Sequence, residues 1–336
     1  MLSTHLHRHS LHHRAHAFLA RTPFSAFETP DSHRSTYMRT FRIPFDAMAS
    51  GCELVLAAID ECEARQAAEA AIDEVRRIEI KYSRYRPDSI VTRINAAAGA
   101  DPVDCDGETL SLLDYADTLY QSSDGLFDIT SGVLRRVWNF QLPRVPAPDE
   151  LAARLKLVGW RRVERDGRQV RLPEAGMEID FGGFGKEYAA DRAGALLEAR
   201  GVRHGYVNLG GDMRVLGPRP DGQPWMIGIQ DPRRKGEVIA TIPVVQGGLA
   251  TSGDYERYFE LDGRRYCHIL DPRTGMPVSH WRTVSVIAPL AVVAGNCTTI
   301  AMLKQADGLG FLEASGMNFL AMDQHGELHT RQPQMA

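Results

Sequence analysis

Apolar residues recur at helical spacing in several parts of the chain, with charged residues between them. In residues 63–82 they recur at intervals of three to four residues, with one adjacent pair: Ala67, Ala71, Ile72, Val75 and Ile78. This spacing places them on one face of an amphipathic helix. Residues 108–123 and 291–304 are also predicted as helices, and a short helix capped by Asp88 or Ser89 is expected between the first two.

Shorter apolar segments, bounded by glycine, proline or aspartate, predict strands. The predicted strands and hairpins are residues 52–58, 160–172, 177–180, 205–217, 225–231, 237–245, 258–261, 265–270 and 284–288. Dipeptides such as Asp166-Gly167 and Asp262-Gly263 favour tight hairpin turns between them. Paired strands among irregularly placed helices predict an α+β fold of mostly antiparallel sheets with packed helices, in contrast to a doubly wound parallel sheet.

The first 37 residues differ in composition from the rest of the chain. Six of the twelve histidines lie within the first sixteen positions, mixed with arginine and serine. A histidine cluster can bind transition metals. Alternatively, Met38 is the true initiator and the residues before it are not translated. We expect residues 1–37 to form a disordered, histidine-rich leader and residues 38–336 to form the folded domain.

Composition narrows the class of protein. Apolar residues make up 43% of the 336 and charged residues 24%, as in globular proteins, and the net charge of −4 gives no reason to expect nucleic acid or an anionic membrane as a partner. The five scattered cysteines show neither metal-site spacing nor a disulfide framework. No apolar run is long enough to span a membrane, and no secretory signal or lipobox is recognisable. We therefore expect a cytoplasmic protein without an integral membrane segment.

One stretch has the composition of a ligand site. Residues 177–192 read M-E-I-D-F-G-G-F-G-K-E-Y-A-A-D-R, which predicts a short strand, a glycine-rich turn and a helix that ends at Gly201. Glycines let backbone N–H groups approach a ligand, and the start of a helix favours phosphate. Lys186 adds a positive charge, and Asp180 can accept hydrogen bonds or hold a cation. A plain connection before a helix would look similar, so this stretch alone leaves both interpretations open.

Two further residues each have a structural interpretation beside a functional one. Tyr85 follows a helix end and could either stack on a ligand ring or pack as a half-buried aromatic. Asp128 precedes a helix predicted around residues 133–138, and capping that helix would account for it without any catalytic role.

Taken together, seven separated motifs give the chain a recognisable order. They read AM-x-S, S-R-Y-x-P-D-S-x-x-x-R-I-N, D-G-L-F-D-I-T-x-G-V-L, I-D-F-G-G-F-G-K-E-Y-A-A-D, N-L-G-G-D-M-R-V-x-G, T-S-G-D-Y-E-R and H-I-L-D-P-R-T-G-x-P-V. In this order the chain resembles the ApbE family, the FAD:protein FMN transferases, from about residue 39 to about residue 330. The resemblance also implies an ApbE-like, T-fold-related α+β architecture with FAD in a cleft between two lobes.

The resemblance implies a Mg²⁺-dependent phosphoryl transfer. Family members cleave the pyrophosphate of FAD, place FMN on a threonine hydroxyl of an acceptor flavoprotein subunit, and release AMP. Such a reaction needs positioning and charge neutralisation more than covalent help from the enzyme. The alternative is a relative that binds or hydrolyses FAD without flavinylating a protein, and absence of flavin affinity would indicate an unrelated binding module.

The resemblance also assigns roles to individual residues. It implies contacts to FAD or its flavin from Met48, Tyr85, Leu126, Phe127, Asp128, Asp180, Lys186 and Leu270. The backbone carbonyl of Gly183 and the hydroxyl of Thr299 match positions that bind the metal, and Thr298 stands at a second metal position. His268 matches a histidine implicated in activity, where it could polarise or deprotonate the incoming threonine, although a histidine bonded to backbone would look the same.

One departure from the family pattern concerns the metal. The family's metal helix typically reads A-D-x-x-x-T, which puts a carboxylate and a hydroxyl one helical turn apart. Here Gly295 stands at the aspartate position, and Thr299 at the threonine position. Because Mg²⁺ prefers hard oxygen ligands, usually including a carboxylate, Asn296, a substrate phosphate or another carboxylate would have to substitute. We expect Gly295→Asp to strengthen the metal dependence.

Overall fold

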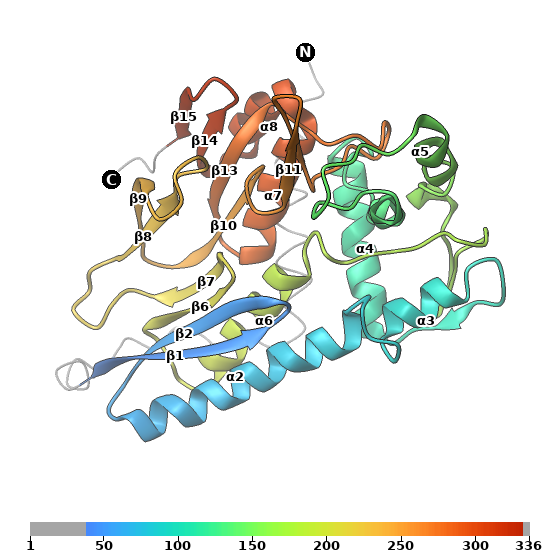
Figure 1. Cartoon of the computed structure of the whole chain (residues 1–336). Coiled ribbons are helices and arrows are strands. Elements are labelled where there is room, and N and C mark those ends of the chain that lie inside the picture. The colour runs from blue at the N-terminus through green and yellow to red at the C-terminus, as the bar shows by residue number, and fades with distance from the viewer. Residues whose placement is uncertain (1–37, 332–336) are drawn as a thin grey trace, which may run out of the picture.

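The computed structural model describes residues 38–331, so the leader predicted at residues 1–37 lies outside the described residues. Figure 1 shows helices and mostly antiparallel strands in one chain. The α-helices are α2 (Glu61–Tyr82), α3 (Ile90–Ala96), α4 (Gly107–Ser122), α5 (Pro148–Leu155), α6 (Gly185–Ala199), α7 (Ala291–Lys304) and α8 (Gly308–Ser315), with 3₁₀ helices η2 (Ile129–Arg136), η3 (Trp160–Arg162) and η4 (Gln305–Asp307). No helix among these residues is both long and apolar enough to cross a membrane.

An eight-stranded sheet is the centre of the fold, in the order β1-β2-β6-β7-β10-β13-β14-β15. Its strands are β1 (Arg39–Ala47), β2 (Ser50–Ala58), β6 (Gly205–Leu209), β7 (Asp212–Gly217), β10 (Gly247–Gly253), β13 (Trp281–Ala288), β14 (Asn318–Asp323) and β15 (Leu328–Arg331). Every neighbouring pair is antiparallel. The prediction of an α+β fold with mostly antiparallel sheet is therefore confirmed.

Both faces of this sheet are covered, by different layers. Helices α2, α6 and α7 pack on one face, where they enclose the main hydrophobic core. The hairpin of β8 (Trp225–Gln230) and β9 (Val238–Val244) covers the other face with a smaller cluster that includes Ile229 and Val244. Strands buried on both sides explain the nearly continuous apolar run in β2 and the weak alternation along β13.

A second, mainly helical lobe lies beside the sheet layers (Figure 1). It contains α3, α4, η2 and α5, with a small sheet of β3 (Val103–Asp104), β5 (Gln169–Arg171) and β4 (Glu164–Asp166). The hairpin of β11 (Tyr258–Leu261) and β12 (Arg264–Cys267) reaches it through stacked aromatic rings of Trp138, Phe140, Phe259 and Tyr266. Aromatic packing thus ties the chain after β10 to the lobe built from its first half.

Most predicted elements are confirmed, and the exceptions have identifiable causes. The predicted strand at residues 177–180 is wrong, because its backbone bonds to non-strand partners. Ile179 N–H donates to Oδ1 of Asn95 at 2.7 Å, Nδ2 of Asn95 donates back to the Ile179 carbonyl at 3.0 Å, and Asp180 N–H donates to the Ile129 carbonyl at 2.9 Å. The strands β1 and β10 were not predicted as strands, and the helix near residues 133–138 is the 3₁₀ helix η2.

A buried carboxylate from α6 caps α7. Asp191 Oδ1 accepts from the Ala291 N–H and Oδ2 accepts from the Val292 N–H, both at 2.9 Å. These are two of the N–H groups that a helix leaves unpaired at its start, and Leu290 at the cap position has no side-chain acceptor. Capping in trans therefore fixes the beginning of α7 against the middle of α6.

We predict that Asp191→Ala lowers the free energy of unfolding by about 2 kcal/mol or more, because two buried N–H groups lose their acceptors. Urea unfolding followed by circular dichroism measures the change. Asp73→Ala, at an exposed position with only a 3.9 Å pair to Arg76, is the control and should change stability by less than about 0.5 kcal/mol. Equal stability of the Asp191 variant and wild type would contradict the capping role.

Candidate active site

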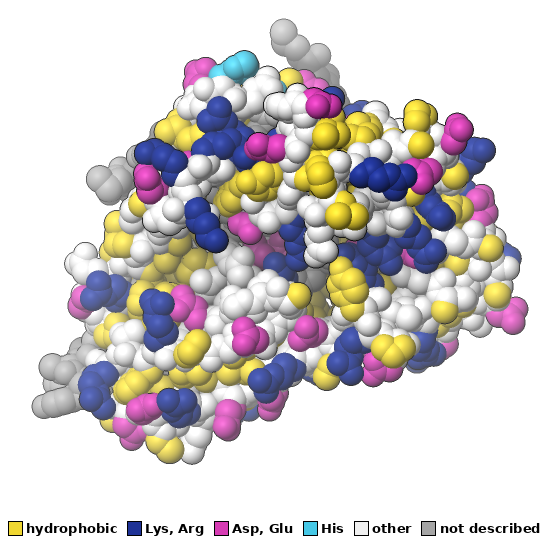
Figure 2. Space-filling model, viewed as in Figure 1, with side chains coloured by type: hydrophobic (Ala, Val, Ile, Leu, Met, Phe, Trp, Pro, Cys, Tyr) yellow, Lys and Arg dark blue, Asp and Glu magenta, His cyan; other side chains and the backbone are white. Residues whose placement is uncertain are grey.

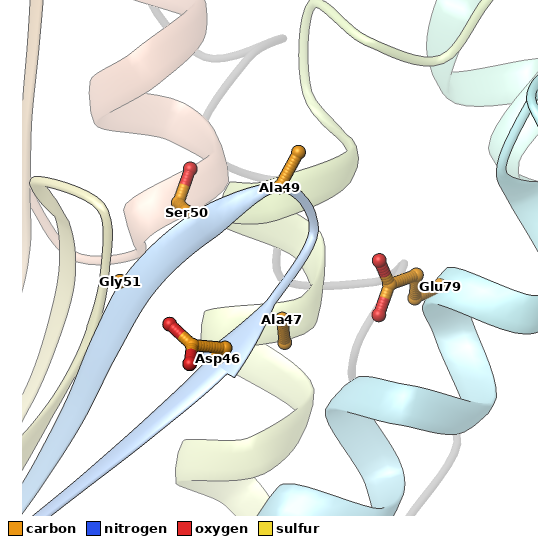
Figure 3. A pocket seen from close by; sticks show the side chains of 6 residues that line it. All are labelled: Asp46, Ala47, Ala49, Ser50, Gly51 and Glu79. Carbon is orange, nitrogen blue, oxygen red and sulfur yellow. The ribbon is translucent and has the colours of Figure 1, made fainter.

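The candidate site lies where the β1–β2 hairpin, the start of α6 and the β6–β7 turn meet. Figure 2 shows this face of the molecule hollowed near its centre, with Lys and Arg side chains gathered beside the hollow. A cavity of about 420 Å³ opens at the hairpin end, and Asp46, Ser50 and Glu79 are among its lining residues (Figure 3). The volume is in the range of small-molecule sites.

The tip of the β1–β2 hairpin has an unfavourable backbone conformation. Met48 and Ala49 have φ angles of 52° and 56°, in the left-handed region that favours glycine. Both positive angles suit the tight turn that joins antiparallel strands. The turn is held from α2, because Oε1 of Glu79 accepts from the Met48 N–H at 2.8 Å. Such strain concentrates at functional sites, and here it falls on the turn whose neighbouring residues Ala47 and Ala49 line the cavity.

The start of α6 offers unpaired N–H groups and a cation. Among the described residues, the N–H groups of Gly183 and Lys186 donate to no acceptor, and the N-cap Phe184 provides no side-chain acceptor. The Lys186 ammonium has no ion-pair partner within 4 Å among residues 38–331. It lies beside the β6–β7 turn, since a Cβ added to Gly210, whose φ is +66°, would come 3.6 Å from its Nζ. This end of α6 is suited to an anion.

Asp180 and Tyr85 are joined by Arg84, which the motif analysis did not single out. The Arg84 guanidinium forms an ion pair with the Asp180 carboxylate and donates to the Tyr85 hydroxyl at 2.6 Å. It also lies 4.7 Å from the centre of the Tyr85 ring. The Tyr85 side chain is 75% exposed, so the half-buried packing alternative does not describe it. Its ring is accessible for stacking, and Asp180 Oδ1 also accepts from the Gly182 N–H at 2.9 Å.

Leu126, Phe127 and Asp128 lie behind the glycine turn and are buried. The Phe127 ring supports the turn directly, since a Cβ on Gly183 would come within 2.8 Å of it. The Asp128 carboxylate accepts from the N–H groups of Thr130 and Trp160 at 2.8 and 3.0 Å, so it caps η2. Burial nevertheless raises its pKa. Direct contact of these three side chains with a ligand stays a prediction.

Acidic groups surround Lys186 on the sheet side. Burial raises the pKa of Asp212 to about 7, and the nearby Glu256 carboxylate adds to the rise while Lys186 opposes it. Burial, followed by repulsion from Asp212, raises the pKa of Glu187 well above its ordinary value. The Asp212 carboxylate thus makes ionisation of Glu187 less favourable.

His268 lies just past β12 and is exposed to solvent. Its backbone N–H donates to the Arg257 carbonyl at 3.0 Å. The surrounding protein atoms, followed by the positive charges of Arg257 and Lys186, lower the pKa of the imidazole to about 4. Its side chain is therefore neutral at physiological pH. Leu270, two residues on, is half-buried and forms an isolated bridge with Pro277.

The face of α7 that turns toward this site carries hydroxyl groups. Ser252 Oγ lies 2.8 Å from Thr298 Oγ1 and 3.3 Å from Thr299 Oγ1. Thr298 is fully buried and its hydroxyl already donates to the Gly295 carbonyl at 2.8 Å. Thr299 keeps some exposure, so it is the better placed of the two for a ligand.

A separate acidic group far along the chain is explained by its turn. Among residues 38–331, only Asp323, Glu327 and His329 bring three ligand atoms from His, Cys, Asp or Glu side chains within 4.8 Å of one another. Asp323 Oδ1 accepts from the N–H groups of His325 and Glu327 at 2.8 and 2.9 Å. These bonds close the β14–β15 turn and account for the acidic residue.

Comparison with known proteins decides the family. The model of the ApbE family matches residues 48–321. The chain belongs to the ApbE family. A Treponema pallidum protein named FAD:protein FMN transferase is 35% identical over 260 residues, which cover 70% of this chain and 72% of the relative. A Salmonella typhimurium protein of the same name is 33% identical over 233 residues, or 66% of each chain.

Solved structures of ApbE proteins share the fold. The crystal structure of the ApbE protein from Thermotoga maritima superposes with a TM-score of 0.80 at 33% identity, and covers 88% of this chain and 97% of that one. The ApbE-like architecture expected from the motifs is therefore confirmed. The matched region contains every site residue that the motifs pointed to, from Met48 to Thr299.

For several residues of this ApbE site, the motifs did not indicate the role that the structure shows. Glu79 acts from the last turn of α2, 31 residues from the hairpin that it holds, and Arg84 meets Asp180 across 96 residues. The motif T-S-G-D-Y contains Ser252, but only the packing of β10 on α7 brings its hydroxyl to the threonines. Asp212 and Glu187 stand inside quoted motifs, and their burial together is the feature that sequence alone did not reveal.

We predict that the His268 imidazole stays neutral down to about pH 5, because desolvation and two neighbouring cations disfavour its protonated form. Following its ring proton by NMR during a pH titration should give a midpoint near 4, with the signal assigned by its absence from His268→Gln. Lys186→Met removes one cation and should raise that midpoint. A midpoint near 6.5 in the wild-type protein would contradict the described environment.

Proposed function

We propose that this protein transfers the FMN half of FAD to a threonine hydroxyl of an acceptor flavoprotein subunit and releases AMP. Its membership of the ApbE family and the printed name of its relatives, FAD:protein FMN transferase, support this activity. The observation that carries it is the convergence, at the hollow beside α6, of the segments with the family's motifs. A cation, unpaired N–H groups and an exposed ring there suit a charged dinucleotide with a flavin.

The FAD pyrophosphate would lie against the start of α6. The unpaired N–H groups of Gly183 and Lys186 and the Lys186 ammonium would neutralise its charge. Tyr85, at the far side of Arg84, is accessible for stacking on the flavin ring. Asp180 would exchange part of its ion pair with Arg84 for hydroxyl or amine donors of the nucleotide.

Oxygen donors at this place also fit Mg²⁺. No backbone N–H of the described residues donates to the carbonyl of Gly183, so it is free to bind a cation. The partly exposed hydroxyl of Thr299 and the half-buried hydroxyl of Ser252 lie close together, and a buried carboxylate, Glu187, lies against the same helix as Thr299. We assign Gly183 and Thr299 as ligands and leave Thr298 to its structural bonds. When bound, the ion would neutralise charge on the pyrophosphate.

The transfer balances without a covalent enzyme intermediate. The threonine oxygen forms a bond to the FMN phosphorus, the bridging P–O bond to AMP breaks, and the hydroxyl proton passes to the phosphate of the departing AMP or to solvent. With its lowered pKa, His268 is a weak base, but it is neutral and can accept a hydrogen bond from the hydroxyl. A loose transition state requires little deprotonation before bond cleavage, so orientation of the nucleophile is the role we give to His268.

The proposed activity predicts two products from one incubation. Purified protein, FAD, Mg²⁺ and a threonine-bearing acceptor subunit should yield AMP, measured by chromatography, and a covalent flavin on the acceptor, located by mass spectrometry. Removing the metal with EDTA should abolish both. An acceptor with that threonine replaced by alanine is the control. Release of AMP without labelling would indicate an FAD-hydrolysing relative instead, and absence of both products would contradict the proposal.

Lys186→Met should weaken FAD binding about 10- to 100-fold, because a charge-assisted contact to phosphate is lost. Quenching of flavin fluorescence or titration calorimetry measures the affinity. The matched control is Lys235→Met, an exposed lysine between β8 and β9, which should leave affinity unchanged. Equal affinities for the two variants would remove Lys186 from the binding site.

A further inference from the structure

The space beside Gly295 is filled by a carboxylate from another helix. A Cβ added to Gly295 would lie 2.3 Å from Oε1 of Glu187, 2.7 Å from its Cγ and 2.8 Å from its Cδ. The Glu187 side chain on α6 therefore occupies the volume into which a side chain at position 295 would point. Helix α7 has no side chain at this position, and α6 places a carboxylate there.

The register of the two helices places this carboxylate among the other candidate ligands. Asp191 on α6 contacts the N–H groups of Ala291 and Val292 at the start of α7, and Glu187 meets Gly295 one turn further along. Four residues back on one helix thus correspond to about four residues forward on the other, as in antiparallel packing. Continued by one more turn, this register would bring Gly183, just before α6, toward Thr299.

Glu187 has no structural partner that would explain its burial. Its side chain is only 7% exposed, and its one hydrogen-bond donor within the described range is its own backbone N–H, with no cation paired to it. Asp191 is equally buried on the same helix, but it accepts two backbone N–H bonds. An unpaired buried carboxylate is costly, and a bound cation is one of the few partners that offsets the cost.

We propose that Glu187 supplies the carboxylate ligand of the divalent metal, from α6, in place of a side chain at position 295. With the Gly183 carbonyl and the Thr299 hydroxyl it would give Mg²⁺ three protein oxygens, and substrate phosphate and water complete such sites. This assignment rests on the proposed function, because the requirement for a divalent metal is part of that proposal. It also revises the expectation for Gly295→Asp: this change alone would displace Glu187 from its place without adding a free position for a second carboxylate.

Binding of Mn²⁺ tests the assignment without any turnover. Electron paramagnetic resonance measures free Mn²⁺ in titrations of the full-length protein, with and without FAD. Glu187→Gln should weaken Mn²⁺ binding at least about tenfold, whereas its thermal stability without metal should be unchanged or higher, because a buried charge is removed. The double variant Glu187→Ala with Gly295→Asp should recover affinity to within a few-fold of wild type, and Glu187→Ala alone should not.

The Mn²⁺ titrations distinguish failure of this inference from failure of the proposed function. Wild-type protein that fails to bind Mn²⁺ even with FAD would overturn the metal requirement of the proposed function, and this inference with it. Wild-type binding that persists unchanged in Glu187→Gln would overturn this inference alone and leave the proposed function standing. A double variant that binds no better than Glu187→Ala would refute the equivalence of the two positions. Asp73→Asn, which changes an exposed acid of α2, is the control and should retain Mn²⁺ affinity.

Discussion

The antiparallel packing of α6 against α7 is the constraint on which the rest of this structure depends. Asp191 ties the start of α7 to the middle of α6, and the absence of a side chain at Gly295 lets the helices approach one turn further on. Because the register is fixed at these two points, the glycine turn before α6 must lie near the hydroxyl face of α7. The candidate site is therefore a product of helix packing beneath the sheet, and the sheet strands supply its walls.

Positively charged and acidic groups lie side by side at this junction. The start of α6 is positive, through unpaired N–H groups and Lys186, whereas Asp212 and Glu187 beside it are acidic with raised pKa values. An anionic ligand can bind the positive end only if the acids are protonated, paired or neutralised by a cation. A dinucleotide phosphate together with a divalent ion would satisfy both sets of groups at once.

Local patterns could predict the elements, because each is specified within a few neighbouring residues. Helical spacing located α2 and α4, and dipeptides such as Asp262-Gly263 located hairpins. The strand predicted at residues 177–180 failed because Asn95, more than 80 residues away, takes over its hydrogen bonds. Motif order was enough to identify the family and the glycine turn, but Arg84 and Glu79 act through contacts across the chain that no local pattern encodes.

The departure at Gly295 shows how a single-position argument can mislead. Taken on α7 alone, the loss of a carboxylate suggests a weakened metal site. In space, the carboxylates of α6 must be counted as well, and they differ in a telling way. Asp191 and Glu187 lie one turn apart and face the same helix. Asp191 accepts from two N–H groups of α7 and has Arg214 4.0 Å away, whereas Glu187 accepts only from its own backbone N–H. Folding accounts for Asp191 completely. It gives no reason to keep an acid at position 187, where a neutral side chain of similar shape would be less costly, so the reason for the acid has to come from something that binds there.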